Sequence, residues 1–421
     1  MTTADIHRTI ETVWKIEAPR LIAGLAHMLR DVGQAEDLAQ EALVVALERW
    51  PSDGVPDNPG AWLMTTARRR AIDQLRHNRM RNDKHAALEY ELETSAMTHA
   101  PDHADALDDD IGDDLLRLIF TACHPVLSRD MQVALTLRML GGLATPEIAR
   151  AFLVPEPTVA QRIVRAKRTL AEKQVPFEVP RGEELVIRLA AVLEVIYLIF
   201  NEGYTATAGD AWVRPRLCEE AMRLGRVLAG LAPREPEVHG MVALMEIHAS
   251  RLHARTAADG TPILLLDQER TRWDRLLIRR GLVALQRAEQ LGGADGNYAL
   301  QAAIAACHAR ALHAEDTDWA WIASLYARLA TVAPSPVVEL NRAVAVSMSE
   351  GPEAGLQLVD VLRKERALAG YHLLPSVRGD LLLKLGRRDE ARQEFERAAS
   401  LTGNARESEL LRRRAAACGD A

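Results

Sequence analysis

Aromatic residues are scarce in this 421-residue chain, at 4% of all positions, and the runs of alternating β-branched residues that strands need are few. Alanine, leucine and arginine are abundant instead, and these residues lose little conformational freedom on entering a helix. The composition therefore favours an all-α fold. At this length the chain has room for two or three domains.

The sequence also lacks the marks of secretion, membrane insertion and metal binding. Its N-terminus has no basic segment followed by an apolar core, so no signal peptide is expected. The longest apolar stretch, 189–200, carries Glu194 and is too short to span a membrane. None of the four cysteines forms a CxxC pair, so neither a zinc site nor a disulfide framework is expected. The simplest interpretation is a cytoplasmic protein with no metal and no cofactor.

Charge is distributed unevenly around a net value of −7. Residues 81–114 hold eleven acidic and two basic side chains, whereas residues 115–174 hold nine basic and four acidic ones. A basic segment therefore follows directly on a strongly acidic one. For nucleic-acid binding, this distribution of charge matters more than the net charge of the chain. Because the acidic stretch has little apolar periodicity, we expect a linker over 81–113.

The segment AEDLAQEALVVALERW (35–50) has the periodicity of an amphipathic helix. Asp37, Gln40 and Glu41 follow one another at i, i+3 and i+4 spacing, so they share one helical face. This polar, acidic stripe suits a basic partner helix. An ordinary solvated face has the same spacing, so the spacing alone does not choose between the two.

The stretch 51–60 breaks the chain, and a second helix is expected to begin at Ala61, within NPGAWLMTTARRRAIDQLRHNR (58–79). Arginines cluster along it. A guanidinium group pairs with phosphate through a planar two-point fork and can also stack on unpaired bases. The tryptophan of this segment is either an aromatic neighbour for such bases or a core residue. The candidate DNA-binding residues are Trp62, Arg68, Arg69, Arg70 and Arg76.

The segment LATPEIARAFLVPEPTVAQRIVRAKRTL (143–170) has the pattern of a helix-turn-helix, with the break at Val154–Glu156. In the second helix, Val159, Ile163 and Ala166 have inward spacing. Glutamine pairs with adenine edges, and arginine pairs with guanine or phosphate. The candidates for DNA contacts on the outward side are Thr158, Gln161, Arg162 and Arg165.

From about residue 181 onward the chain is again helical in pattern. Two stretches, beginning at Ser335 and Leu374, are typical of tetratricopeptide units. In each, an apolar helix ends at a glycine, and Gly351 and Gly386 are 35 positions apart, close to the repeat period of about 34 residues. We expect stacked helix pairs in this half.

These motifs, in this order, resemble the extracytoplasmic-function (ECF) RNA polymerase sigma factors: 35–50 and 58–79 their region 2, and 143–170 their region 4. The segments 192–207, 265–275, 313–326 and 335–346 are similar to the tetratricopeptide-like extension of one ECF subgroup. The resemblance implies four parts. They are a region-2 domain (1–80), an acidic linker (81–113), a helix-turn-helix region-4 domain (114–175) and a helical regulatory domain (181–421).

The resemblance also implies partners, which are promoter DNA and the β′ and β subunits of core RNA polymerase. The face of Asp37, Gln40 and Glu41 would bind a coiled coil of β′, the arginine-rich helix would recognise and melt the −10 element, and the helix-turn-helix would read the −35 element. The chain departs from the common family pattern at Arg69, where asparagine is frequent, and at Ala160, where lysine is frequent.

Two other functions stay open at this stage. The chain could be a helix-turn-helix regulator that does not engage polymerase, or an enzyme housed in its C-terminal half. We find no catalytic constellation there, so no enzyme is expected.

A polar group in the C-terminal half forms either a salt-bridge network between helices or a regulatory groove for an unknown protein or small molecule. The extension either holds the DNA-binding domains closed or is required for activity. The candidate groove residues are Asp267, Arg270, Trp273, Asp274, Asn341 and Arg342.

Overall fold

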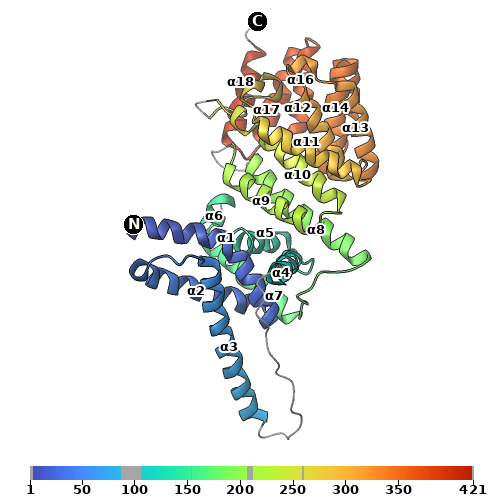
Figure 1. Cartoon of the computed structure of the whole chain (residues 1–421). Helices are drawn as coiled ribbons and strands as arrows, with labels where there is room; N and C mark the ends of the chain where they lie inside the picture. The colour runs from blue at the N-terminus through green and yellow to red at the C-terminus, as the bar shows by residue number, and fades with distance from the viewer. Residues whose placement is uncertain (1–2, 87–105, 153, 206–211, 258–259, 420–421) are drawn as a thin grey trace. The chain divides into compact units, whose positions relative to one another are not determined.

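The computed structural model describes residues 3–86, 106–152, 154–205, 212–257 and 260–419 (Figure 1). These residues form α-helices and short 3-10 helices. Within the described ranges there is no strand, only an isolated antiparallel bridge between two residues of one loop. The predicted all-α fold is therefore confirmed. In the same ranges no helix is long and apolar enough to cross a membrane.

The chain divides into two compact units, Met1–Val195 and Ile196–Ala421, and the long helix α8 belongs to both. Within the described residues, the N-terminal unit contains seven helices and the first part of α8. Its helices are α1 (Thr3–Leu29), α2 (Val32–Asp53), α3 (Pro59–Ala86), α4 (Ala106–Ala122), α5 (Arg129–Met139), α6 (Thr145–Phe152), α7 (Glu156–Glu172) and α8 (Glu183–Tyr204).

The first three helices pack on one another because each presents an apolar stripe to a shared core. The Asp31 side chain caps α2 by accepting a hydrogen bond from the backbone N–H of Gln34 at 2.9 Å. The helix ends at Gly54, whose φ of 86° lies in the left-handed region. Trp50 is buried at the end of α2 and meets Trp62 of α3 edge-on, with ring centroids 5.4 Å apart. This contact fixes the start of α3 against the end of α2.

Helical structure enters both ends of the acidic segment 81–113. No proline or glycine interrupts the chain between residues 61 and 86, and α3 continues to Ala86. On the other side, α4 begins at Ala106. The middle of the predicted linker, 87–105, lies outside the described residues.

The helix-turn-helix is formed by α6 and α7, and α5 packs against both of them. The backbone N–H of Val154 donates to the carbonyl of Ala149 at 3.1 Å, which closes the end of α6. The first half of α8 joins this unit as well. Arg188 of α8 is 5% exposed, and it donates to the carbonyl of Phe120 at 2.9 Å while lying over the ring of the same residue.

The C-terminal unit continues as a series of helices, most of which pack on their neighbours in sequence, while α12 packs mainly on α10. The predicted helix pairs are confirmed: α14 and α15 meet at Gly351, and α16 and α17 meet near Gly386, with φ values of 104° and 76°. The α-helices after α8 are α9 (Pro215–Leu231), α10 (Pro236–Ala249), α11 (Arg275–Gln290), α12 (Asn297–Arg310), α13 (Trp319–Val332), α14 (Pro336–Glu350), α15 (Pro352–Leu362), α16 (Leu373–Lys384), α17 (Arg388–Leu401) and α18 (Ala405–Ala417).

Short 3-10 helices connect several of these helices. They are η1 (Leu252–Ala254), η2 (Leu265–Asp267), η3 (Arg270–Arg272), η4 (Ala314–Asp316) and η5 (Arg366–Leu368). All four cysteines of the chain are free and buried. Burial raises the pKa of the Cys123 thiol to about 11 and that of Cys218 to about 12.

Candidate functional site

The acidic stripe of α2 includes two exposed carboxylates, and both are paired with other helices of the N-terminal unit. The carboxylate of Asp37 accepts a hydrogen bond from the ammonium group of Lys167, on α7, at 3.1 Å. The carboxylate of Glu41 pairs with Arg70, on α3. In this conformation the face predicted to bind a partner is therefore engaged within the chain itself.

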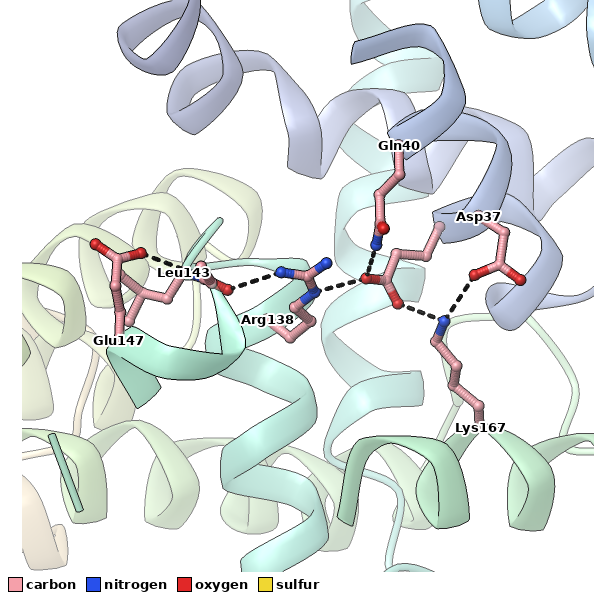
Figure 2. A network of polar contacts seen from close by, with 8 residues as sticks. Asp37, Gln40, Arg138, Leu143, Glu147 and Lys167 are labelled. Atoms are coloured by element: carbon pink, nitrogen blue, oxygen red, sulfur yellow. Dashed lines mark hydrogen bonds and ion pairs between the residues drawn. The ribbon is translucent and has the colours of Figure 1, made fainter. Parts of the chain in front are cut away.

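Behind this stripe lies a buried carboxylate, Glu36, that the sequence analysis missed. Its side chain is 2% exposed, and it binds Arg138 of α5 at 2.7 Å and Lys167 of α7 at 2.6 Å. The Gln40 side chain, which is half-buried, donates to the same carboxylate at 2.5 Å. Figure 2 shows Gln40, Arg138 and Lys167 pointing toward one another.

The charge of Glu36 is maintained by its two cations. Burial alone would raise the pKa of this carboxyl group, but the charges and hydrogen bonds of Lys167 and Arg138 outweigh burial, and the pKa is lowered. The local signal was an acidic residue on the apolar side of α2, next to Ala35 and four positions after Val32. Such a position requires a buried partner.

Arg138 extends the network to the start of the helix-turn-helix. Its guanidinium group donates to the carbonyl of Leu143 at 3.3 Å as well as to Glu36. One residue further on, the backbone N–H of Ala144 donates to the carboxylate of Glu147 at 2.8 Å, in the first turn of α6 (Figure 2). Arg138 therefore links Glu36 of α2 to the segment that precedes α6.

The arginines of α3 differ in how they are engaged. Arg68 and Arg69 are exposed and have no ion pair with any other described residue. Arg76 is also exposed and stands 3.9 Å from Asp73, while Arg70 is held by Glu41. The predicted aromatic residue of this helix packs on Trp50 and is half-buried, so its ring belongs partly to the core.

On α7 the predicted DNA-facing residues lie away from the core, and the apolar positions of the same helix are buried. Gln161 and Arg165 are exposed, whereas Thr158 is half-buried. Arg162 is half-buried and pairs with Asp130 of α5 at 2.5 Å. The face of Gln161 and Arg165 is thus uncovered, while a different side of the helix carries the contact with α2.

In the C-terminal unit, two of the six candidate groove residues lie together in the interior. Arg270 and Trp273 are 6% and 3% exposed, and the guanidinium carbon is 5.0 Å from the ring centroid. Arg270 also donates to the carbonyls of His308 and Ala311 and to the hydroxyl of Thr317. These two candidate groove residues are therefore in contact with each other, and both are buried.

The other four candidates have separate local roles. Asp274 caps α11 by accepting hydrogen bonds from two backbone N–H groups at 2.8 and 3.0 Å. Asp267 is exposed in a 3-10 helix, Asn341 is exposed on α14, and Arg342 pairs with Glu339 at 2.7 Å. Among the described residues no interaction joins these four side chains to one another. The described ranges also hold no group of three or more side chains suited to a metal ion.

Comparisons with known proteins identify three segments of the chain. Residues 14–81 match sigma-70 region 2, residues 117–170 match sigma-70 region 4, and residues 188–289 match a family of unknown function (DUF6596). The first two matches contain α2, most of α3 and the helix-turn-helix. The third begins at Arg188 in α8 and contains the irregular segment before α11.

Similar whole proteins agree with these matches. An uncharacterized protein of Rhizobium meliloti is 44% identical over 396 residues, which cover 94% of this chain and 92% of that protein. The ECF RNA polymerase sigma factor SigK of Mycobacterium ulcerans is 28% identical over 36% of this chain and 78% of its own length. The ECF RNA polymerase sigma factor SigC of Mycobacterium tuberculosis is 27% identical over 41% of this chain and 83% of its own length.

Proposed function

Because this chain belongs to the ECF sigma factors, in the subgroup with a C-terminal helical extension, we propose that it binds core RNA polymerase and directs the recognition and opening of promoters. The observation that carries this proposal is the presence of region 2 and region 4 in order, with a separate polar face on each. Membership in the family makes it a DNA-binding factor of transcription initiation. In this role it acts in the cytoplasm without covalent chemistry of its own.

The polymerase contact is assigned to the stripe of Asp37, Gln40 and Glu41. Two exposed carboxylates at i and i+4 suit a basic helix of the β′ coiled coil. Arg70, the partner of Glu41, keeps 41% of its side chain exposed, and exposed ion pairs contribute only about 0–1 kcal/mol each. Lys167, the partner of Asp37, keeps 20% of its side chain exposed, but the Asp37 carboxylate itself is exposed. A polymerase helix that presents several basic groups can therefore replace these two cations.

Replacement has a further consequence, because both cations of Glu36 come from the region-4 helices α5 and α7. If polymerase moves these helices away from α2, Glu36 loses Lys167 and Arg138 together. An uncompensated buried carboxylate is unfavourable, so the conformation with α2 and α7 in contact opposes polymerase binding until new partners form. We assign the contact of Glu36 with Lys167 and Arg138 the role of holding region 2 and region 4 together before polymerase arrives.

Promoter contacts are assigned to two surfaces that the closed arrangement leaves accessible. On α3, Arg68 and Arg69 are free to bind phosphates and unpaired bases of the −10 element, with Arg76 beside them. On α7, Gln161 and Arg165 are exposed for the major groove of the −35 element. Phosphate contacts contribute most of the affinity, so binding should weaken as salt rises.

The test is a pull-down of core RNA polymerase by the full-length protein and by the double variant Asp37→Arg/Glu41→Arg. We expect the wild type to retain polymerase and the variant to lose it. The matched control is Glu350→Arg/Glu353→Arg, which changes the net charge equally at two exposed residues near the turn between α14 and α15. Retention of polymerase by the α2 variant, or failure of the wild type to bind, would contradict the assignment and favour a regulator that does not engage polymerase.

A further inference from the structure

The interior of the C-terminal unit contains a cluster in which arginine and aromatic side chains alternate. Each of the three arginines lies over one or two aromatic rings, with guanidinium-to-centroid distances of 3.8 to 5.7 Å. We call this set the arginine–aromatic cluster. In order of contact its members are Trp212, Arg255, Tyr204, Arg251, Trp273 and Arg270.

Among the described residues, no carboxylate forms an ion pair with these arginines. Arg251 donates to the hydroxyl of Tyr204 at 2.5 Å, and Arg255 donates to the hydroxyl of Thr205 at 2.9 Å. Arg270 donates to the carbonyls and the hydroxyl described above. None of the ion pairs between described residues includes any of the three. Their hydrogen-bond partners within the described ranges are therefore neutral groups.

The positive charge of the cluster cannot be removed by titration, because guanidinium groups stay protonated at every accessible pH. Arg255 and Arg270 are 9% and 6% exposed, and Arg251 is half-buried. Burial lowers the pKa of Arg251 and Arg270, and the neighbouring guanidinium groups lower it further. The carboxylate of Asp316 acts on Arg270 in the opposite direction, but from beyond ion-pair distance.

The aromatic faces compensate only part of the free-energy cost of burying these charges. A desolvated cation–π contact contributes roughly 2 kcal/mol, whereas removing an ion from water costs several kcal/mol. Four buried nitrogen atoms of the cluster and its surroundings also have no hydrogen-bond partner among the described residues. They are Arg255 Nε, Arg270 Nε, Trp273 Nε1 and His308 Nδ1. The arginine and tryptophan nitrogens among them are N–H donors, and buried donors normally have a partner.

We propose that the arginine–aromatic cluster binds a small oxyanion, namely a carboxylate or phosphate group of a low-molecular-weight ligand. Such a group supplies both missing elements: negative charge for three guanidinium groups and acceptor oxygens for free N–H donors. The planar forks of arginine are suited to two-point contacts with either anion. The site lies entirely in the C-terminal unit, so it does not depend on the proposed contacts of regions 2 and 4.

The experiment measures the thermal stability of the full-length protein at constant pH and ionic strength while sodium chloride is replaced by sodium phosphate or by sodium acetate. At a concentration ten times the dissociation constant, we expect the melting temperature of the C-terminal transition to rise by about 3 °C. A rise with phosphate alone identifies a phosphate site. A rise with acetate alone identifies a carboxylate site.

Two variants test whether the response comes from the cluster. Arg251→Gln removes the guanidinium group that contacts both Tyr204 and Trp273, and it should abolish the rise. Arg280→Gln makes the same change of charge at an exposed position of α11 and should leave the rise intact. An equal rise in the Arg251→Gln variant would show that the anion binds elsewhere, and the proposal would fail.

Direct binding to the wild type keeps the proposal testable if Arg251→Gln does not fold. Equilibrium dialysis of labelled phosphate, and separately of labelled acetate, should show one bound anion per chain that excess chloride does not displace. If neither anion binds and neither raises the melting temperature, the cluster is a self-contained structural element without a ligand, and the proposal is wrong.

Discussion

Two sites of this sigma factor, one in each unit, bury charge in opposite ways. In the N-terminal unit, the Glu36 carboxylate meets two cations, Arg138 and Lys167, within 2.7 Å. At the site in the C-terminal unit, Arg251, Arg255 and Arg270 meet aromatic faces, hydroxyls and carbonyls, and none of the three has an ion pair with another described residue. The carboxylate of the first site is paired twice, whereas the arginines of the second have no paired carboxylate among the residues that the structure describes.

This difference separates a contact that holds helices together from a site that attracts a ligand. A buried carboxylate with two cations stabilises only the conformation that keeps all three together, so it couples α2 to α5 and α7. Buried cations without counterions gain stability from an anion supplied by solution. The comparison fails if removing the Glu36 charge leaves the stability of the N-terminal unit unchanged. It also fails if anions do not stabilise the arginine–aromatic cluster.

The largest effect is expected from Glu36→Gln. Removing the charge leaves Arg138 and Lys167 without their shared partner, and we expect a loss of about 3 kcal/mol in the free energy of opening α2. Each cation keeps about one-fifth of its side chain exposed, so the loss should fall at the low end for buried pairs. Hydrogen exchange of α2 peptides, measured by mass spectrometry, gives this free energy. Unchanged protection in α2 would refute the coupling.

The pH dependence provides a second measurement on Glu36. Its folded-state pKa is lowered below the ordinary value of 4.5, so its contribution is present above pH 4.5 and is lost as pH falls through the folded-state pKa. The difference between wild type and Glu36→Gln should therefore be constant near pH 6–7 and shrink below pH 4.5. If the stability difference between wild type and Glu36→Gln grew on acidification, the pKa of Glu36 would be raised in the folded protein and not lowered.

The next effect concerns His308, next to the arginine–aromatic cluster. Burial and the nearby Arg251 and Arg270 lower the pKa of its imidazole to about 3. The unfolded chain binds this proton first, so stability is present above about pH 6.5 and is lost below it. Between pH 7.5 and 5.5 the wild type should lose about 1.4 kcal/mol more than His308→Asn, measured by urea unfolding at each pH. The exposed His253→Asn serves as the control, and it should keep the wild-type slope.

A smaller effect is expected from Lys167→Ala on polymerase binding. This variant loses the contacts of α7 with Asp37 and Glu36, so less free energy opposes separation of α7 from α2. We expect the apparent affinity for core polymerase to rise about fivefold, measured by competition with a labelled wild-type protein. Arg168→Ala changes the same helix but removes only a pair with Glu172, and should not alter affinity. Equal affinity in both variants would mean that the α2–α7 contact does not oppose binding.

The smallest effect is expected at Glu41, the exposed carboxylate of α2, and it is compared with that at the buried Glu36. Arg70→Gln removes the partner of Glu41, but both side chains are about half-exposed. We expect less than about 0.5 kcal/mol of change in the protection of α2, because solvent screens exposed pairs. A change as large as that of Glu36→Gln would show that burial is not what distinguishes the two carboxylates.

Local periodicity predicted the elements of this fold well, and it failed where charge partners lie far apart in the chain. The i to i+4 spacing of Asp37 and Glu41 depends on one helix, and the structure contains that helix. The turns at Gly351 and Gly386 likewise depend on local sequence, and both are present. The pair of Glu36 and Arg138 joins residues 102 positions apart, which no helical period can reveal.

The same limit applies to the C-terminal unit. Arg270 and Trp273 were identified because they are close in sequence, whereas Arg251 and Arg255 lie in an irregular segment before the bridge between Thr256 and Pro262. Only the tertiary structure brings them into contact with Tyr204 and Trp273. The sequence shows which charged residues are present, but not which of them lack an ion pair with another described residue.

The buried cysteines have a practical consequence for such experiments. With a pKa near 11, the Cys123 thiol is ionised in only about one molecule in ten thousand at pH 7, and thiolate is the form that reacts with alkylating dyes. All four native thiols are buried. Cysteines introduced at exposed positions of α2 and α7 can therefore be labelled selectively in an otherwise native chain, and the distance between two fluorophores would report each separation of these helices in real time.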